Sequence, residues 1–206
     1  MSDVIVDEPA LRALHDPVSQ LAQLKQIDHL DPHCRRFIAL SPFLVIGSTR
    51  PGRGTDVSPR GDAPGFVQVI DEKTLFVPDR PGNNRLDTMS NLVHEAEVGL
   101  LFMIPGVDET LRVNGTARLS RDAGRLAAAE VQGKQPKVGI EIAVREAFLH
   151  CGKALKRSKL WQDDYKVERA VLPSLSRMIV EQTKATNVDI EAAERRTEEA
   201  YRTKLW

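Results

Sequence analysis

The segment from residue 110 to residue 119 alternates between apolar and polar side chains over its whole length. Successive side chains of a β-strand point to opposite faces of its sheet, so this period of two predicts a strand. One face of the strand should be buried and the other should face water. The apolar set is Leu111, Val113, Gly115, Ala117 and Leu119, and the polar set is Arg112, Asn114, Thr116 and Arg118.

Five other short apolar runs also predict strands, at residues 43–46, 66–70, 74–77, 98–104 and 137–149. The turn-like residues Asp71, Glu72 and Lys73 separate two of these runs, which predicts a hairpin. The last run is longer than an average strand, which predicts a bulge or a bend. Six strands with one clear helix between them favour an antiparallel barrel over a parallel βαβ sheet. The expected class is mainly β, with helices at both ends of the chain.

Helical patterns flank the predicted strands. Residues 8–40 carry apolar side chains every three or four positions, at Leu11, Leu14, Val18, Leu21 and Leu24, which predicts a helical arm. Residues 84–96 predict the helix between the strands, and Asn84 with Asp87 resembles a capping box. From residue 163 onward we expect two helices, the second supported by Glu191–Arg195 and Glu198–Arg202 pairs. The chain should therefore divide into an arm (residues 1–40), a barrel (residues 41–161) and a C-terminal helical extension (residues 162–206).

The charge balance and hydropathy pattern exclude several kinds of partner. Lysine plus arginine and aspartate plus glutamate each number 29, so we expect no nucleic-acid partner. The longest apolar runs are far shorter than the roughly 20 residues that span a membrane, so we expect no membrane partner. The first residues, MSDVIVDEPA, are acidic where a secretory signal is basic, which predicts a cytoplasmic location.

The cysteines and histidines do not predict a metal or thiol centre. Cys34 and Cys151 are too few and too far apart in sequence for a disulfide framework or a thiolate zinc site. His29 and His33 are four residues apart, but Pro32 interrupts the helical turn that would align them. We therefore expect unpaired thiols and a surface helix junction.

Three segments concentrate groups that suit a phosphate: residues 56–62, 78–85 and 156–161. In the second, a strand ending at Val77 runs through a proline-glycine turn into a helix that begins near Arg85. Backbone amides and the positive end of a helix dipole, beside an arginine, favour a phosphate monoester. The alternative is that Asn84 only caps the helix and Arg85 is solvated.

In the first segment, Ser58 and Arg60 are two residues apart and project to the same face of an extended backbone. A hydroxyl and a guanidinium fork could hold one phosphate together. The alternative is a polar loop in which Asp62 pairs with Arg60.

The run from Pro42 to Ser120 resembles the FMN-binding split barrel of the pyridoxamine 5′-phosphate oxidase family. The matching segments are FLVIGS, DVSPRGD, LFVPDRPGNNRLDT, VGLLFMI and LRVNGTARL. The chain looks most like a branch of FMN-dependent flavoproteins that also carry HCxKALxRSxLW, which reads HCGKALKRSKLW from His150 to Trp161. The resemblance extends over residues 27–161 and implies a six-stranded antiparallel split β-barrel.

The resemblance also implies a cofactor and its ligands. Arg60 and Arg85 would hold the phosphate of FMN, with Ser58 and Asn84 as hydrogen-bonding partners. The backbone at Val77, Pro78 and Asp79 would lie along the flavin.

By the same resemblance, the protein is a homodimer with FMN at the subunit interface, and it acts on a small-molecule substrate or electron donor. Lys156, Arg157 and Trp161 would approach the flavin of the partner subunit, where either cation would stabilise a reduced flavin and Trp161 would cover its ring. The alternative for Trp161 is ordinary packing.

The chain departs from the oxidase itself at three places, the first being the family's threonine position, which reads proline or aspartate here. The family's serine-arginine-lysine triplet reads Asn83-Asn84-Arg85 here, and the arginine and histidine near the C-terminus that hold the substrate phosphate are not found. FMN binding tolerates these departures better than oxidation of pyridoxamine phosphate does. The sequence thus predicts an FMN-dependent oxidoreductase, and it leaves open a non-catalytic flavin- or haem-binding carrier or sensor.

Overall fold

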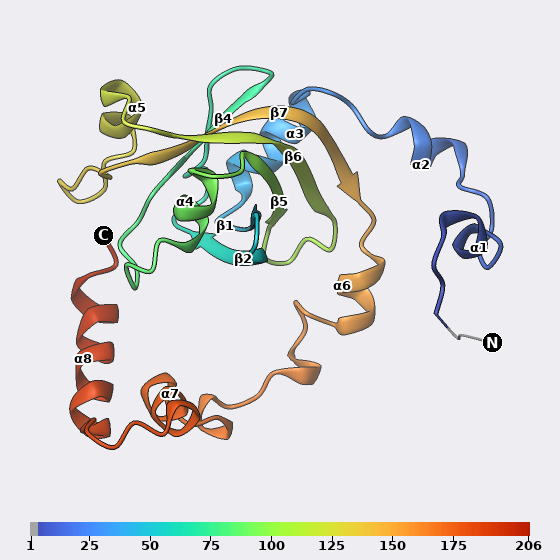
Figure 1. The fold of residues 1–206 in the computed structure, drawn as a ribbon. Helices are drawn as coiled ribbons and strands as arrows, with labels where there is room; N and C mark the ends of the chain where they lie inside the picture. The colour runs from blue at the N-terminus through green and yellow to red at the C-terminus, as the bar shows by residue number, and fades with distance from the viewer. Residues whose placement is uncertain (1–3) are drawn as a thin grey trace.

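The computed structural model describes residues 4–206, and residues 1–3 lie outside the described part. Its centre is a seven-stranded antiparallel sheet that curls into a split β-barrel (Figure 1). The strand order is β2-β1-β5-β6-β7-β4-β3, so β2 and β3 form the two edges. The strands are β1 (Phe43–Arg50), β2 (Gly54–Gly61), β3 (Gln68–Val69), β4 (Thr74–Pro78), β5 (Glu97–Met103), β6 (Thr110–Ser120) and β7 (Gly139–His150).

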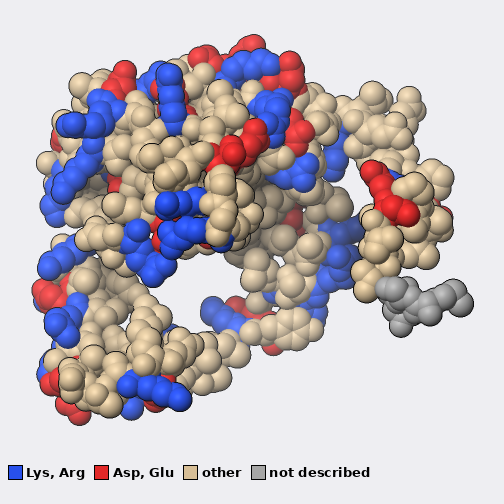
Figure 2. Space-filling model, in the orientation of Figure 1, with Lys and Arg blue, Asp and Glu red and all other residues tan. Residues whose placement is uncertain are grey.

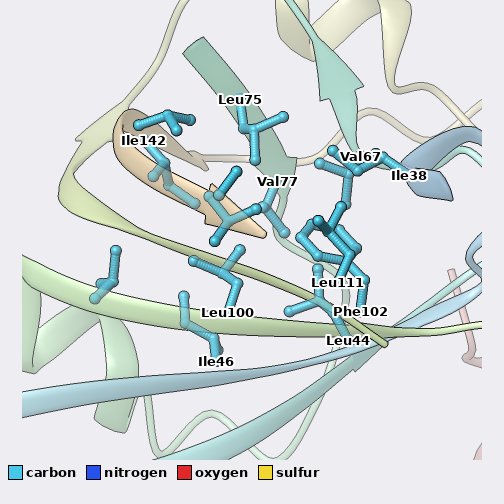
Figure 3. Packing of buried hydrophobic residues seen from close by; sticks show 14 of the residues in the cluster. Ile38, Leu44, Ile46, Val67, Leu75, Val77, Leu100, Phe102, Leu111 and Ile142 are labelled. Carbon is cyan, nitrogen blue, oxygen red and sulfur yellow. The ribbon is translucent and has the colours of Figure 1, made fainter. Parts of the chain in front are cut away.

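The interior of the barrel is filled by one apolar core (Figure 3). Leu44 of β1, Phe102 of β5 and Leu111 of β6 are almost completely buried within it. The alternation predicted for β6 is confirmed over most of the strand, but Leu119 near its end is exposed. The side chains of β6 therefore line the core on one face, as its period of two requires.

All six predicted strands are present, together with the predicted hairpin between β3 and β4. β2 is the strand that the sequence pattern missed, because its side chains are mostly polar and it pairs only with β1. The predicted irregularity in β7 is also confirmed. Asn114 pairs with Glu146 while Gly115 pairs with Val144, so Arg145 is an extra residue that forms a bulge.

The N-terminal segment is helical in three short pieces, so the single apolar stripe predicted for a helical arm is wrong. It contains the short helices α1 (Glu8–Arg12) and α2 (Gln20–Leu24), followed by α3 (Pro32–Leu40). All five residues of the predicted apolar stripe are exposed. Pro17 separates α1 from α2 and Pro32 begins α3, because proline fits the first turn of a helix but not its interior.

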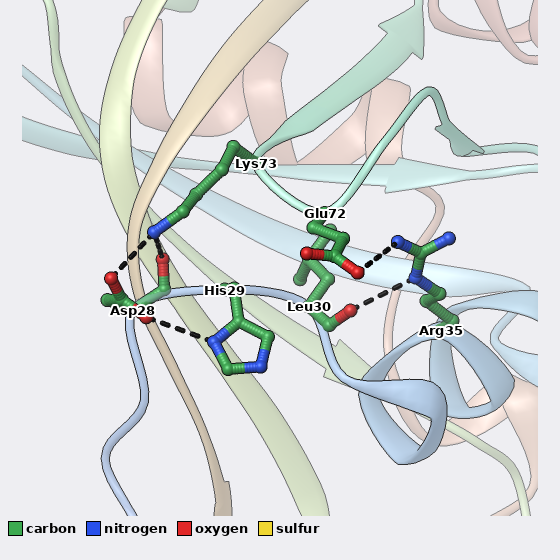
Figure 4. A network of polar contacts seen from close by, with 6 residues as sticks. All are labelled: Asp28, His29, Leu30, Arg35, Glu72 and Lys73. Atoms are coloured by element: carbon green, nitrogen blue, oxygen red, sulfur yellow. Dashed lines mark hydrogen bonds and ion pairs between the residues drawn. The ribbon is translucent and has the colours of Figure 1, made fainter.

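A polar network fastens α3 and the segment before it to the turn between β3 and β4 (Figure 4). Lys73 Nζ lies 2.7 Å from Asp28 Oδ2, and Arg35 forms an ion pair with Glu72 at 3.7 Å. The backbone of Ile27 also bridges to Ala147 of β7. Lys25 Nζ donates to Leu149 O, and Gln26 Nε2 donates to Glu146 Oε2, so the polypeptide is joined to the barrel from Lys25 onward.

The C-terminal arm (residues 151–206) leaves the barrel at the end of β7 and returns to it at Trp206. The two predicted helices are present as α7 (Leu175–Thr183) and α8 (Ile190–Thr203). The arm also holds α6 (Lys153–Ser158) and the 3-10 turns η1 (Asp163–Tyr165) and η2 (Arg169–Val171), and α5 (Ala123–Ala128) lies between β6 and β7. Figure 2 shows an opening between this arm and the barrel.

One of the two charge pairs predicted for α8 is confirmed. Glu191 and Arg195 lie 3.7 Å apart. Arg202 pairs with Glu199 at 2.5 Å instead of with Glu198, since residues three apart on a helix are also neighbours.

Candidate functional site

One face of β2 is polar and half-buried. Asp56, Ser58 and Arg60 occupy alternate positions on this face, whereas Val57 and Pro59 between them are exposed. The prediction that Ser58 and Arg60 share a face is therefore confirmed. An arginine and a hydroxyl on one half-buried strand face offer several donors to the same ligand.

The helix α4 (Asp87–Leu92) packs against this part of the sheet through a buried amide. Asn91 Nδ2 donates to Asp56 Oδ2 at 2.6 Å and to Ser48 Oγ at 3.0 Å. Arg50 Nη1 donates to Ser90 Oγ at 3.1 Å. These contacts hold α4 in place against β1 and β2.

The start of α4 differs from the prediction. The helix begins at Asp87 and ends at Leu92, so the span predicted for it, residues 84–96, is too long at both ends. Asn84 does not cap it: Leu86 occupies the cap position, and both residues have left-handed backbones, with φ of 58° and 59°. The capping box is therefore wrong, because two residues with positive φ turn the chain just before the helix.

Arg85 lies in this turn and faces solvent. Its backbone N–H donates to Asn83 Oδ1 at 3.0 Å, and its Nε donates to Asp87 Oδ2 at 2.8 Å. The side chain is 68% exposed. Arg85 is thus a rim residue that is already paired with a carboxylate.

A cavity of about 290 Å³ lies where β2, the end of β4 and the turn before α4 meet. We call it the first cavity. It brings together five of the ten predicted ligand residues: Ser58, Arg60, Asp79, Asn84 and Arg85. Val77 and Pro78 are buried in β4 and lead into Asp79. In Figure 2, lysine and arginine side chains gather over α4 and the loop before it.

Arg60 and Asp79 form the central ion pair of the first cavity. Arg60 Nη1 lies 3.2 Å from Asp79 Oδ1, and the two side chains are only 19% and 23% exposed. Burial raises the pKa of the Asp79 carboxyl, and the Arg60 guanidinium opposes that rise. The alternative in which Asp62 pairs with Arg60 is wrong, because Asp62 pairs with Arg80 at 2.5 Å.

Two buried polar atoms in residues that line this cavity lack hydrogen-bond partners within the described part of the chain. They are Arg60 Nε and Thr88 Oγ1. Buried donors of this kind are rare in folded proteins and indicate a group that completes them. Both atoms suit an anion with several oxygens.

Thr88 is the site residue that the sequence reasoning missed. It is 1% exposed, and together with Met89, Asn91 and Leu92 it forms the buried face of α4. The available signal was the pair Thr88 and Asn91, three residues apart and so on one helical face. Leu86, Met89 and Val93 repeat at helical spacing in the sequence, but only Met89 is buried, whereas Leu86 and Val93 are exposed.

The remaining three predicted residues are not at the first cavity of this chain. Lys156 and Arg157 belong to α6, and Trp161 follows it. Trp161 Nε1 donates to Val107 O at 2.9 Å, and Lys156 Nζ lies 3.8 Å from Asp108 Oδ2. These contacts fasten α6 to the loop between β5 and β6.

The comparisons with known proteins agree with this fold. A family model described as pyridoxamine 5′-phosphate oxidase matches residues 30–151, which is more than half of the chain. The chain belongs to the pyridoxamine 5′-phosphate oxidase family. The matched span runs from the residues before α3 to the end of β7, so it includes all seven strands of the sheet. No curated protein sequence matched the chain.

Several solved structures are similar to this member of the family. HupZ from Group A Streptococcus is 15% identical, with a TM-score of 0.48 over 58% of this chain and 92% of that one. An FMN-binding protein from Syntrophomonas wolfei is 11% identical, with a TM-score of 0.43 over 57% and 81%. HutZ from Vibrio cholerae, a haem storage protein, is 12% identical, with a TM-score of 0.41 over 59% and 93%.

Within residues 4–206, none of the helices is long and apolar enough to cross a membrane. In the same range, histidine, cysteine, aspartate and glutamate side chains form no group of three or more that would bind a metal ion.

Proposed function

We propose that the protein is an FMN-binding flavoprotein and an FMN-dependent oxidoreductase, with the phosphate of FMN in the first cavity. The observation that carries this proposal is the pair of unpartnered buried atoms, Arg60 Nε and Thr88 Oγ1, in residues that line that cavity. A phosphate monoester has three oxygens that accept hydrogen bonds and a charge that an arginine neutralises.

Each residue of the first cavity would make a different contact with FMN. Arg60 uses Nη1 for Asp79, so its Nε stays available for a phosphate oxygen. Thr88 adds a neutral donor from α4, and Ser58 adds another from β2. Asn84 and Arg85 close the solvent side. The backbone from Val77 to Asp79 lies beside the path of the flavin ring.

FMN supplies the hydride or electron transfer, while the protein binds and orients it. The Arg60–Asp79 pair sets the charge of the site before binding, since the buried carboxylate neutralises the buried guanidinium. A phosphate that approaches Arg60 must therefore offset the repulsion from Asp79. The raised pKa of Asp79 lowers this repulsion, because the carboxyl takes up a proton more readily than an exposed aspartate does.

We also propose that the protein is a homodimer in the cytoplasm. Most of its exposed large apolar side chains lie in the N-terminal segment before α3 and in the C-terminal arm, where no barrel surface covers them within the described residues. A second copy would bury these side chains and cover the edge strand β2. Lys156, Arg157 and Trp161 would then face the partner's flavin. The free thiol of Cys151, which is exposed, suits a reducing compartment.

The purified protein tests the proposed cofactor. We expect it to carry the yellow absorbance of oxidised flavin, or to acquire it when FMN is added, and its mass in solution to be that of two chains. Riboflavin, which lacks the phosphate, should bind more weakly than FMN. A colourless protein that neither carries FMN nor binds it in titration would refute the proposal.

A non-catalytic flavin- or haem-binding carrier or sensor is the second candidate function. The observation that favours it is that the described residues lining the first cavity offer no unpaired acid or base. Asp79 and Asp87 are each paired with an arginine, and no histidine, cysteine or tyrosine is among the described residues that line the cavity. Steady-state assays with nicotinamide donors and common acceptors separate the two candidates. Rapid reduction and reoxidation would exclude the carrier, and flavin binding without turnover would favour it.

A further inference from the structure

A second cavity of about 350 Å³ adjoins the first. The two share the residues of one wall: Asp79, Arg80, Pro81 and Asn84. The far wall of the second cavity is formed by the segment before β7, residues 134–137, and by Trp206 of the C-terminal arm. A volume of this size is at the lower end of the range for pockets that hold small organic ligands.

The position of Trp206 is set by contacts to two parts of the barrel. Its Nε1 donates to Asp62 Oδ1 at 3.1 Å, and its backbone O accepts from Lys134 Nζ at 2.7 Å. Asp62 is itself held by the Arg80 ion pair. One hydrogen bond thus holds the indole and the other holds the backbone of Trp206, which lines the second cavity.

Among the charged side chains that line the second cavity, one cation has no ion-pair partner in the described part of the chain. Arg80 is paired with Asp62, Lys134 is engaged by Trp206, and Asp79 is paired with Arg60. Lys137 forms no ion pair with any described residue, and it is exposed at the cavity. The cavity thus combines flat apolar surfaces, from Trp206 and two prolines, with a single available positive charge.

We infer that the second cavity is the binding site for the second reactant, a planar aromatic molecule that carries a carboxylate or a similar anionic group. Its ring would stack on Trp206 and its charge would pair with Lys137. This inference rests on the proposed function, because the shared wall would place that molecule beside the flavin. It names a substrate class, which the first cavity alone does not do.

Two naphthalene compounds test the inference: 2-naphthoate, which is an anion, and 2-naphthamide, its neutral analogue. Each is titrated into the full-length protein with and without FMN, and the indole N–H signal of Trp206 is followed by NMR. The signal is assigned by its loss in Trp206→Phe. We expect 2-naphthoate to shift it, in the presence of FMN, and to bind about three- to fivefold more tightly than 2-naphthamide, as for a partly exposed ion pair.

Variants of Lys137, with an exposed lysine elsewhere as the control, test whether Lys137 binds the carboxylate. Lys137→Ala should abolish the preference for 2-naphthoate, Lys137→Arg should keep it, and Lys166→Ala, which changes an exposed lysine of the C-terminal arm, should leave it unchanged. Equal binding of the two compounds, an unmoved Trp206 signal, or a preference that survives Lys137→Ala would overturn the inference. Displacement of FMN by 2-naphthoate would also overturn it, because the second cavity would then belong to the flavin. Failure of FMN to bind would instead refute the proposed function, and it is measured separately.

Discussion

Replacing Arg60 tests whether this residue binds the phosphate of FMN. Arg60→Ala removes a mostly buried guanidinium whose Nε has no partner in the described protein. The loss of one charge-assisted hydrogen bond costs about 1.5 to 3 kcal/mol, which corresponds to roughly 10- to 150-fold in affinity. We therefore expect FMN to bind at least tenfold more weakly. The affinity for riboflavin should not change.

Arg60→Ala also affects folding, because it leaves the Asp79 carboxylate largely buried without its cation. An unpaired buried polar group costs about 1 to 3 kcal/mol, so the melting temperature should fall. The double variant Arg60→Ala/Asp79→Asn removes the buried charge and should recover part of this stability. Its FMN affinity should stay low, which separates ligand binding from folding.

Asp79→Asn alone isolates the role of the carboxylate. Because burial raises the pKa of Asp79, the ionised form destabilises the protein at neutral pH, and this cost disappears as the pH falls and the carboxyl takes up a proton. Asp79→Asn should thus be more stable than wild type at neutral pH and should bind FMN more tightly. Both differences should vanish in acid.

The assay is a titration that follows flavin fluorescence, with FMN and riboflavin measured side by side. Arg85→Ala serves as the exposed control: its side chain is 68% exposed and paired with Asp87, so the loss should be only about two- to fivefold. If Arg60→Ala weakened riboflavin as much as FMN, or weakened neither, Arg60 would not be a phosphate ligand and the first cavity would not be the phosphate site.

Four further outcomes are expected. Thr88→Val should leave the melting temperature unchanged or higher, since it removes an unpartnered buried hydroxyl, yet it should weaken FMN binding about two- to tenfold; equal losses for riboflavin would contradict this. Cys151 should react with a thiol reagent before Cys34, as measured by mass spectrometry. Cys151 is exposed and has a lowered pKa, whereas burial raises the pKa of Cys34 to about 12. Labelling of Cys34 in the native protein would count against the structure. Gly139→Ala should destabilise the barrel by about 1 to 3 kcal/mol in denaturant unfolding, since a Cβ there would overlap the Phe76 ring. Gly82→Ala, where a Cβ meets nothing within 4 Å, serves as the control. The Asp28–Lys73 contact should persist in acid until the pH falls toward about 2, because the hydrogen bond from Lys73 lowers the pKa of the Asp28 carboxyl to about 2. An NMR titration of Asp28 with a midpoint near 4 would show that the contact does not form.

The strands of the barrel could be predicted because their side chains carry the signal of burial. β6 alternates since one face meets the core and the other meets water, and the excess length of β7 correctly indicated a bulge. β2 carries no such signal. It lies at an edge of the sheet, and its polar face serves the first cavity instead of the core.

The candidate site could be predicted in part. Ser58, Arg60, Asp79, Asn84 and Arg85 meet at one cavity, as the family resemblance implied. The pairing of Arg60 with Asp79 was out of reach, because it joins strands that are not neighbours in the sheet. The left-handed turn at Asn84 and Leu86 was also missed, since leucine has no local preference for positive φ.

The return of the C-terminal arm to the barrel makes a closed loop, and loop closure has an entropic cost. For a chain of about fifty residues, the cost of bringing the ends together is roughly 3 to 4 kcal/mol before any further constant. The closure at Trp206 rests on two hydrogen bonds, which contribute only about 0.5 to 1.5 kcal/mol each. The two hydrogen bonds offset only part of this cost, so the packing of Trp206 in the wall of the second cavity must supply the rest. Any molecule that binds against the docked indole draws the population toward closure by mass action, so that the affinity measured for that molecule is reduced by the fraction of released arms.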